Sequence, residues 1–233
     1  MNDAARWLFD AHERCERFAA IPESIRPRDA DQAYAVQDAF VALKQARYGA
    51  LAGHKIALTT PQMRKMAGLD DSIAGAVLER QVHRSPAVVR AADYGNLIIE
   101  FEIACVLEAD LPADGAPYTR GSVGRAVAAL QPAFELADDR NADYTRMVEH
   151  RMELIADNAW NEGAVLGEPL YDWRRLDLVG IRGAATINGK PVGEGRGGDV
   201  MGHPFEALAW VANNLARRGR CLRAGEFVIT GSL

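Results

Sequence analysis

Residues 98–107 read IIEFEIACVL, an apolar run that contains two acids, Glu100 and Glu102. The β-branched residues of this run favour a strand over a helix. Side chains alternate between the two faces of a strand, so both glutamates point to the same face, about 6 to 7 Å apart. Ionised carboxylates this close repel each other and lose hydration when they are half-buried. The run therefore predicts either a cation held between the glutamates or the solvated face of an amphipathic strand.

The composition is that of an ordinary globular protein: 233 residues, of which 48% are hydrophobic and 25% charged. This length suits one domain, or one large domain with a small appendage. The net charge of −5 does not indicate a surface for nucleic acid or anionic membranes. No apolar run reaches the roughly 20 residues of a membrane helix, and the N-terminus lacks the apolar core of a signal peptide. The three cysteines form no CxxC pair, which argues against disulfides and a zinc knuckle. We expect a cytoplasmic protein.

Capping residues and proline mark the elements of the N-terminal part. Residues 1–50 have the apolar spacing of two helices, the first capped by Asp3 and the second by Asp29 or Asp31. A short strand follows and ends at Thr60-Pro61, which is a strong helix start because proline is preorganised for the first helical position.

The remainder of the chain mixes strands and helices without a regular alternation. Residues 69–97 look loop-like. After the glutamate strand we expect a helix capped by Ser122 and ended by Pro132, a strand over 133–139, a helix around 147–159, a hairpin over 183–192, a helix opened by His203-Pro204 and a strand over 226–233. This order favours an α+β fold over a doubly wound sheet. It also suggests an N-terminal helical segment over 1–50 and a sheet-containing unit over 51–233.

A third acid, Glu135, stands alone in the short apolar strand PAFELADD. Three such acids could supply three oxygen ligands to a hard cation such as Mg²⁺ or Mn²⁺, leaving three of six positions for water and substrate. Spacing along the sequence does not show that the three side chains meet.

Five segments in order resemble the fumarylacetoacetate hydrolase superfamily, and within it the branch of 2-oxoalkenoate (2-keto-4-pentenoate) hydratases and 4-oxalocrotonate decarboxylases. They are GHKIALTTPQM (53–63), EFEIACVLE (100–108), PAFELADDR (132–140), ADNAWNEGAVLG (156–167) and the stretch from VMGHPF to the end (200–233). The resemblance implies a barrel-like mixed sheet over 51–233 with N-terminal helices, a role in degrading aromatic compounds, and a homo-oligomer. It also places a divalent cation on Glu100, Glu102 and Glu135.

The same resemblance suggests roles for residues around the cation. The family lysine falls on Lys55, which could hold a substrate carboxylate or exchange protons, although a surface lysine is the alternative. The Asp-Asn-Ala segment falls on Asp157, which is either a proton shuttle or a turn cap. Thr59, Thr60 and Asn158 are the expected substrate-binding residues.

Two departures from the family pattern, at Ile73-Ala74 and at Trp160, could alter substrate choice or weaken a proton transfer. Relatives usually continue some tens of residues further, so we expect a shortened chain or an open sheet edge. Four functions are considered for this chain, of which three are enzymatic activities. The first is hydration of a 2-hydroxydienoate, and the second is decarboxylation of a 2-oxo dicarboxylate. Hydrolysis of a C–C bond ranks third because no histidine dyad is evident. The last is a non-catalytic subunit associated with a related pathway enzyme.

Overall fold

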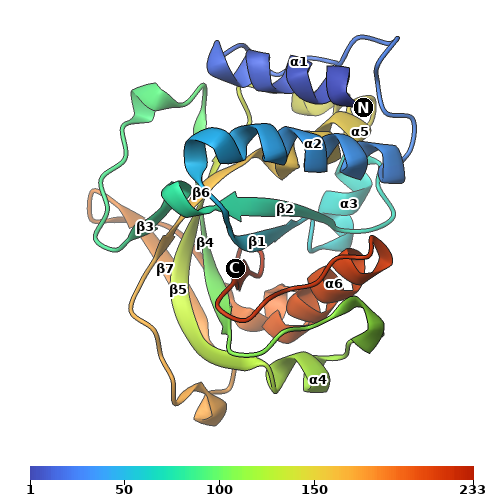
Figure 1. Cartoon of the computed structure of the whole chain (residues 1–233). Helices are drawn as coiled ribbons and strands as arrows, with labels where there is room; N and C mark the ends of the chain where they lie inside the picture. The colour runs from blue at the N-terminus through green and yellow to red at the C-terminus, as the bar shows by residue number, and fades with distance from the viewer.

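The computed structural model describes residues 1–233 and has helices packed around one mixed β-sheet (Figure 1). The sheet has seven strands in the order β2 (Ile73–Leu78), β1 (Leu51–Ala57), β9 (Phe227–Ile229), β4 (Leu97–Leu107), β5 (Val127–Asp138), β6 (Asn161–Leu166) and β3 (Val82–Arg84). The pairs β1–β9 and β3–β6 are parallel, and the others are antiparallel. The α+β class and the mixed sheet are confirmed, but the sheet is open rather than a closed barrel.

The helices form two groups on either side of β1 (Figure 1). A separate hairpin of β7 (Arg182–Ile187) and β8 (Lys190–Arg196) has the expected Asn188-Gly189 turn, with both residues at positive φ. None of the helices combines the length and apolar character needed to cross a membrane. The helices are α1 (Asn2–Glu13), α2 (Ala30–Tyr48), α3 (Pro61–Ala67), α4 (Arg120–Gly124), α5 (Arg151–Ala156) and α6 (Pro204–Arg217).

Two hydrophobic clusters hold these layers together. One lies between α6 and the sheet and includes Ile56, Cys105 and Leu208, which are almost fully buried. The other joins α1, α2 and α5 to β2, so the N-terminal helices share their core with strands that follow residue 50. Burial of these side chains contributes about 25 cal/mol per Å² of apolar surface.

Several predicted helix starts are confirmed. The Asp29 side chain accepts a hydrogen bond from the Gln32 N–H at the start of α2. The Thr60 hydroxyl accepts one from the Met63 N–H at 3.2 Å, and α3 ends at Gly68 in the left-handed conformation. At α1 the cap is Met1 rather than Asp3, which lies inside the first turn.

The region 69–97, expected to be loop-like, contains β2 and β3. This expectation was wrong for β2 because all six of its residues are buried, so the strand lacks the alternation that marks a half-exposed strand. Its burial depends on α2 and α5, which come from distant parts of the sequence.

The helix expected to run up to Pro132 is also wrong. Only α4 forms, capped by Thr119 with Ser122 as the third helical residue, and β5 then runs through Pro132. The strand forms because it pairs with β4 along nearly its whole length. The Pro132 carbonyl accepts a hydrogen bond from the Gly167 N–H. Proline has no N–H to donate in return, and the Gln131 side chain donates to the Gly167 carbonyl instead.

Candidate metal centre

The pairing of β4 with β5 brings the three predicted glutamates together. Glu100 lies directly opposite Glu135 in the antiparallel register, and Glu102 lies two residues further along the same face. One carboxylate oxygen from each lies within 4.8 Å of the other two. Glu102 and Glu135 are buried, whereas Glu100 is partly exposed. Like charges directly across a strand pair destabilise a sheet, so this arrangement needs a compensating charge.

The carboxylates retain buried oxygens with no hydrogen-bond partner. Glu102 Oε2 accepts from the Gly231 N–H at 2.6 Å, but Oε1 accepts nothing. Glu135 Oε1 accepts from the Asn161 side chain at 3.0 Å, but Oε2 accepts nothing. Unpaired buried polar atoms are rare in native proteins because they cost free energy. An all-oxygen donor set with free lone pairs fits a hard divalent cation.

The pKa shifts point to the same need for positive charge. Burial, followed by the charges of Glu135 and Glu100, raises the pKa of Glu102 well above its usual range. Burial also raises the pKa of Glu135, although Lys55 opposes that shift. A bound cation would compete with protons for these carboxylates.

Lys55 lies beside the glutamates on β1 and is buried rather than at the surface. Its Nζ lies 2.9 Å from Glu135 Oε1 and donates a hydrogen bond of 3.3 Å to the Ala159 carbonyl. Burial lowers the pKa of Lys55, but the charges of the three glutamates outweigh burial and raise it. Lys55 therefore stays charged in the metal-free protein.

A cavity of about 160 Å³ opens onto this cluster. Glu100, Lys55 and Thr59 contribute its polar wall, and Lys55 is the one cationic side chain that lines it. Trp160 and Tyr144, whose rings meet edge to face, line it as well. The other walls are largely apolar and include Met63, Met66, Ile98, Met147 and Leu154.

Three predicted site residues outside the glutamate cluster, Thr60, Asp157 and Asn158, do not line this cavity. Thr60 caps α3. The Asn158 side chain makes two hydrogen bonds, of 2.7 and 2.8 Å, to the Ala76 backbone. Asp157 is fully buried, and its two oxygens accept from His12 and Arg140. The structure thus brings together the three glutamates, Lys55 and Thr59, while the catalytic and substrate-binding roles suggested for all of these residues stay predictions.

The sequence analysis missed the turn that carries part of the cavity wall. Asn158, Ala159 and Trp160 all have positive φ, at 55°, 49° and 60°, and this conformation directs the Ala159 carbonyl at Lys55. Asparagine tolerates the left-handed region, but alanine and tryptophan give no sequence signal for it.

Comparisons with known proteins agree with this geometry. No protein-family model matches the chain. It is 33% identical to a 2-keto-4-pentenoate hydratase of Paraburkholderia phymatum over 99% of this chain and 86% of the relative. It is 32% identical to a 2-oxo-hept-4-ene-1,7-dioate hydratase of Escherichia coli, over 98% and 86%.

Among solved structures, the 4-oxalocrotonate decarboxylase of Pseudomonas putida G7, complexed with magnesium and adipate, superposes with a TM-score of 0.87. It is 26% identical, and the match covers 100% of this chain and 86% of that one. The identity to the hydratases extends over nearly the whole chain, and the fold is shared with the decarboxylase. The chain therefore belongs to the hydratase branch of the fumarylacetoacetate hydrolase superfamily.

Proposed function

We propose that this protein is a divalent-metal-dependent lyase that hydrates a 2-hydroxydienoate or its 2-oxoalkenoate tautomer. The observation that carries the proposal is the convergence of Glu100, Glu102 and Glu135, two of them with unpaired buried oxygens. Glu100 and Lys55 connect this cluster to the cavity, because both line it. Hydratase relatives over nearly the full length support the same reaction class.

The three glutamates would hold Mg²⁺ or Mn²⁺. Such an ion supplies Lewis-acid stabilisation for negative charge that develops on the oxygen of a 2-oxo acid. The structural neighbour complexed with magnesium supports a divalent ion as the cofactor.

Lys55 provides the chain's own contribution to the reaction. Its charged ammonium faces the cavity, and the Glu135 carboxylate and Ala159 carbonyl fix its position. We propose that Lys55 orients the substrate carboxylate, donates a proton to the substrate carbon and recovers a proton from the 2-hydroxyl group of the substrate. The apolar walls restrict bulk water near the unsaturated chain, so that hydration depends on a water molecule admitted at the polar wall.

The walls of the cavity favour a monocarboxylate over a dicarboxylate. Lys55 already faces three glutamates, and no second cation lines the cavity. A second carboxylate on the substrate would be buried against Met63, Leu154 and similar side chains without a partner, which costs several kcal/mol. This observation supports our proposal of hydration of a short monoacid over decarboxylation of a 2-oxo dicarboxylate.

A paired assay with added Mg²⁺ or Mn²⁺ tests the proposal. One arm follows loss of 2-hydroxypenta-2,4-dienoate, and the other follows CO₂ release from 4-oxalocrotonate. We expect the first reaction without the second, its loss in Glu102→Gln, and its retention in Glu108→Gln, an exposed glutamate just beyond β4. CO₂ release without hydration would establish the decarboxylase instead. Metal binding with no turnover on either compound would indicate a non-catalytic subunit.

A further inference from the structure

The turn formed by residues 158–160 is held in a conformation that its sequence does not favour. The left-handed region costs about 1 to 2 kcal/mol for each residue such as Ala159 and Trp160, and these two directly follow Asn158, which tolerates it more readily. The turn matters to the cavity because Ala159 supplies the carbonyl that Lys55 contacts, and Trp160 supplies part of the wall. Contacts outside the turn must therefore hold it in place.

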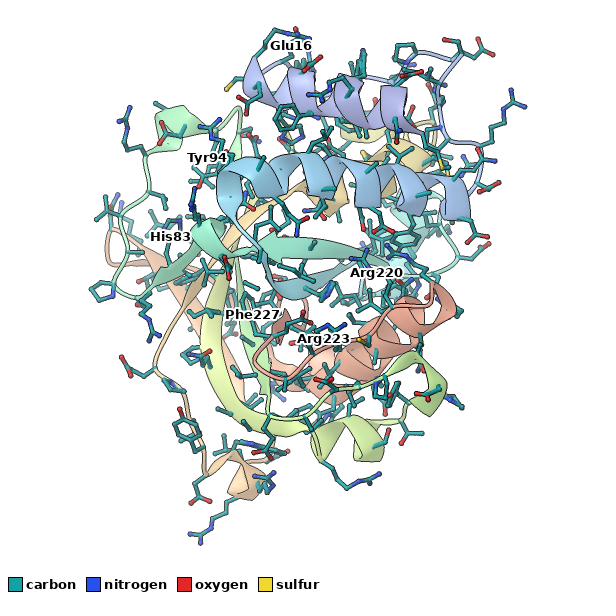
Figure 2. All side chains as sticks on the ribbon, in the orientation of Figure 1. Glu16, His83, Tyr94, Arg220, Arg223 and Phe227 are labelled. Atoms are coloured by element: carbon teal, nitrogen blue, oxygen red, sulfur yellow. The ribbon has the colours of Figure 1, made fainter.

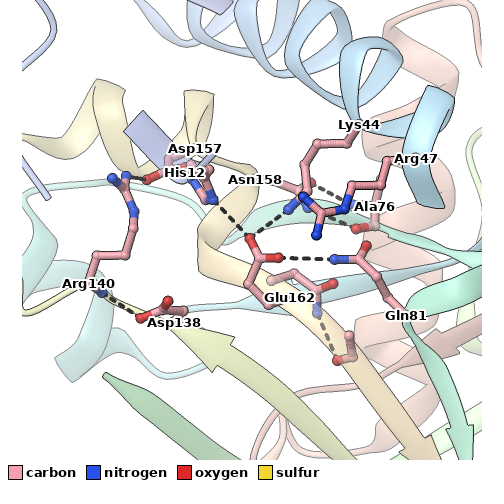
Figure 3. Close-up of polar contacts among 12 residues, drawn as sticks. His12, Lys44, Arg47, Ala76, Gln81, Asp138, Arg140, Asp157, Asn158 and Glu162 are labelled. Atoms are coloured by element: carbon pink, nitrogen blue, oxygen red, sulfur yellow. Dashed lines mark hydrogen bonds and ion pairs between the residues drawn. The ribbon is translucent and has the colours of Figure 1, made fainter. Parts of the chain in front are cut away.

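A buried carboxylate, Asp157, and a partly buried one, Glu162, bracket this turn, and a single histidine lies between them. Asp157 precedes the turn, and Glu162 follows it in β6. His12, at the C-terminal end of α1, has its Nε2 2.5 Å from Asp157 Oδ1 and its Nδ1 3.1 Å from Glu162 Oε1 (Figure 3). The imidazole thus connects both ends of the turn to a helix that is distant in sequence.

Each carboxylate has further donors of its own. Arg140 donates to Asp157 Oδ2 at 2.5 Å. Lys44 donates to Glu162 Oε1 at 2.6 Å, and Gln81 donates to Oε2 at 3.0 Å (Figure 3). Removing the imidazole would leave neither carboxylate without a cation, so the loss of His12 should loosen the turn without unfolding the protein.

Both nitrogens of His12 face carboxylate oxygens, which requires a proton on each nitrogen. Burial lowers the pKa of His12, but Asp157 and Glu162 outweigh burial and raise it. For Asp157, burial raises the pKa, but the charges of Arg140 and His12 outweigh burial, so the pKa of Asp157 is lowered. The two carboxylates are therefore ionised at neutral pH, and His12, Arg140 and Lys44 are their cationic partners.

We propose that His12 is a positioning residue that clamps both ends of the 158–160 turn and thereby sets the Ala159 carbonyl and Trp160 against Lys55 and the substrate. The effect of the clamp on the substrate rests on the proposed function. The clamp itself follows from the contacts of His12 with Asp157 and Glu162. His12 touches neither the three glutamates nor the cavity at the metal centre, so it is not a catalytic residue.

A second cavity makes the clamp accessible to a chemical test. It measures about 540 Å³ and is lined by His12, Lys44, Arg140 and Glu162. His83 and Tyr94 also line it, and Figure 2 shows them next to the C-terminal end of α2. A molecule as small as imidazole can enter a polar cavity of this size and replace a missing imidazole ring.

The test compares His12→Ala with the wild-type chain and with Arg47→Ala. Arg47 lines the same cavity, but its side chain makes only an exposed ion pair with Glu13 and a contact with the ring of Tyr48. Its loss should therefore change neither kcat nor the hydrogen exchange of the turn. In His12→Ala we expect kcat for 2-hydroxypenta-2,4-dienoate to fall by up to about 100-fold, which a misplacement near 1 Å can cause, with metal affinity unchanged. Added imidazole should restore part of kcat, which a general loss of stability would not allow.

Hydrogen exchange measured by mass spectrometry gives a readout that does not depend on turnover. Peptides over residues 157–163 should exchange about tenfold faster in His12→Ala than in the wild type, while peptides of β4 remain unchanged. Wild-type exchange together with wild-type kcat would overturn the proposal. If no form of the protein turns over, the proposed function fails, and the exchange data alone decide the clamp.

A second variant covers the case in which His12→Ala does not fold. The amide of His12→Gln can donate to Asp157 or accept from a neighbour, but it cannot donate to both carboxylates from opposite sides. We expect the same faster exchange over 157–163 and no rescue by imidazole, because the site is filled. Protection equal to that of the wild type in His12→Gln would refute the double clamp.

Discussion

Glu102→Gln should stabilise the metal-free protein and reduce the further stabilisation that bound metal provides. At 4.8 Å and an effective dielectric constant of about 20, each like-charged pair of carboxylates repels by about 332/(20 × 4.8), or about 3.5 kcal/mol. Glu102 can avoid this repulsion by taking up a proton. The cost at pH 7 therefore cannot exceed the free energy of protonating an ordinary glutamate, about 1.36 × (7 − 4.3), or about 3.7 kcal/mol.

Glutamine relieves this cost and keeps an oxygen to accept the Gly231 N–H. We therefore expect metal-free Glu102→Gln to be more stable than the wild type by about 1 to 4 kcal/mol. Changes outside the first coordination sphere already weaken metal binding about 10- to 100-fold, so losing a ligand should cost at least about 100-fold in Mn²⁺ affinity. At saturating metal, a 100-fold loss removes about 2.7 kcal/mol of stabilisation.

Urea unfolding with and without Mn²⁺ measures both effects, and calorimetric titration gives the affinity. Glu108→Gln is the matched control, because Glu108 is exposed just beyond the end of β4 and should show neither effect. A metal-free Glu102→Gln protein less stable than the wild type would show that the carboxylate is held by favourable contacts. Equal stabilisation of both proteins by Mn²⁺ would refute Glu102 as a ligand.

Three further predictions concern the charges around the site. Lys55→Met should lower the free energy of unfolding of the metal-free protein by about 3 to 5 kcal/mol, because Glu135 loses its buried cationic partner; a loss below about 1 kcal/mol in urea unfolding would contradict this. Mn²⁺ affinity should rise as the pH increases above the usual titration range of a glutamate, because Glu102 must release a proton before it binds the ion. Calorimetric titration in buffers of different ionisation enthalpy counts the protons released on binding, and a count of zero would contradict competition between the proton and the ion. The folded state binds the His12 proton more tightly than the unfolded state, so this stabilisation is complete below pH 6.5 and lost as pH rises through the raised pKa. Replacing His12 with glutamine should flatten the alkaline decline in unfolding free energy, and identical slopes would argue against the shift.

Local chemistry was sufficient to predict several parts of this structure. The Thr60-Pro61 start of α3 and the Asn188-Gly189 turn depend on a few adjacent residues, and both are confirmed. The shared face of Glu100 and Glu102 follows from the two-residue period of a strand. The α+β class follows from the order of the elements and is also confirmed.

Features that depend on distant contacts were not predictable in the same way. The register that sets Glu135 opposite Glu100 is a property of the β4–β5 pair, and only the resemblance to a family suggested that these acids meet. Pro132 ends helices, yet it lies within β5 because the surrounding ladder accommodates it. His12 contacts Asp157 across 145 positions of sequence, and a lone histidine on a helix carries no sign of such a partner.

The central claim is that one divalent ion binds among Glu100, Glu102 and Glu135 and presents open positions to a 2-oxo acid. Crystals grown with Mn²⁺ and oxalate, a stable mimic of the enolate, test it through an anomalous difference map recorded at the manganese edge. The account predicts a single strong peak bonded to all three carboxylates and to two oxalate oxygens. A map without a peak among these glutamates, or with oxalate bound away from the ion, would contradict it.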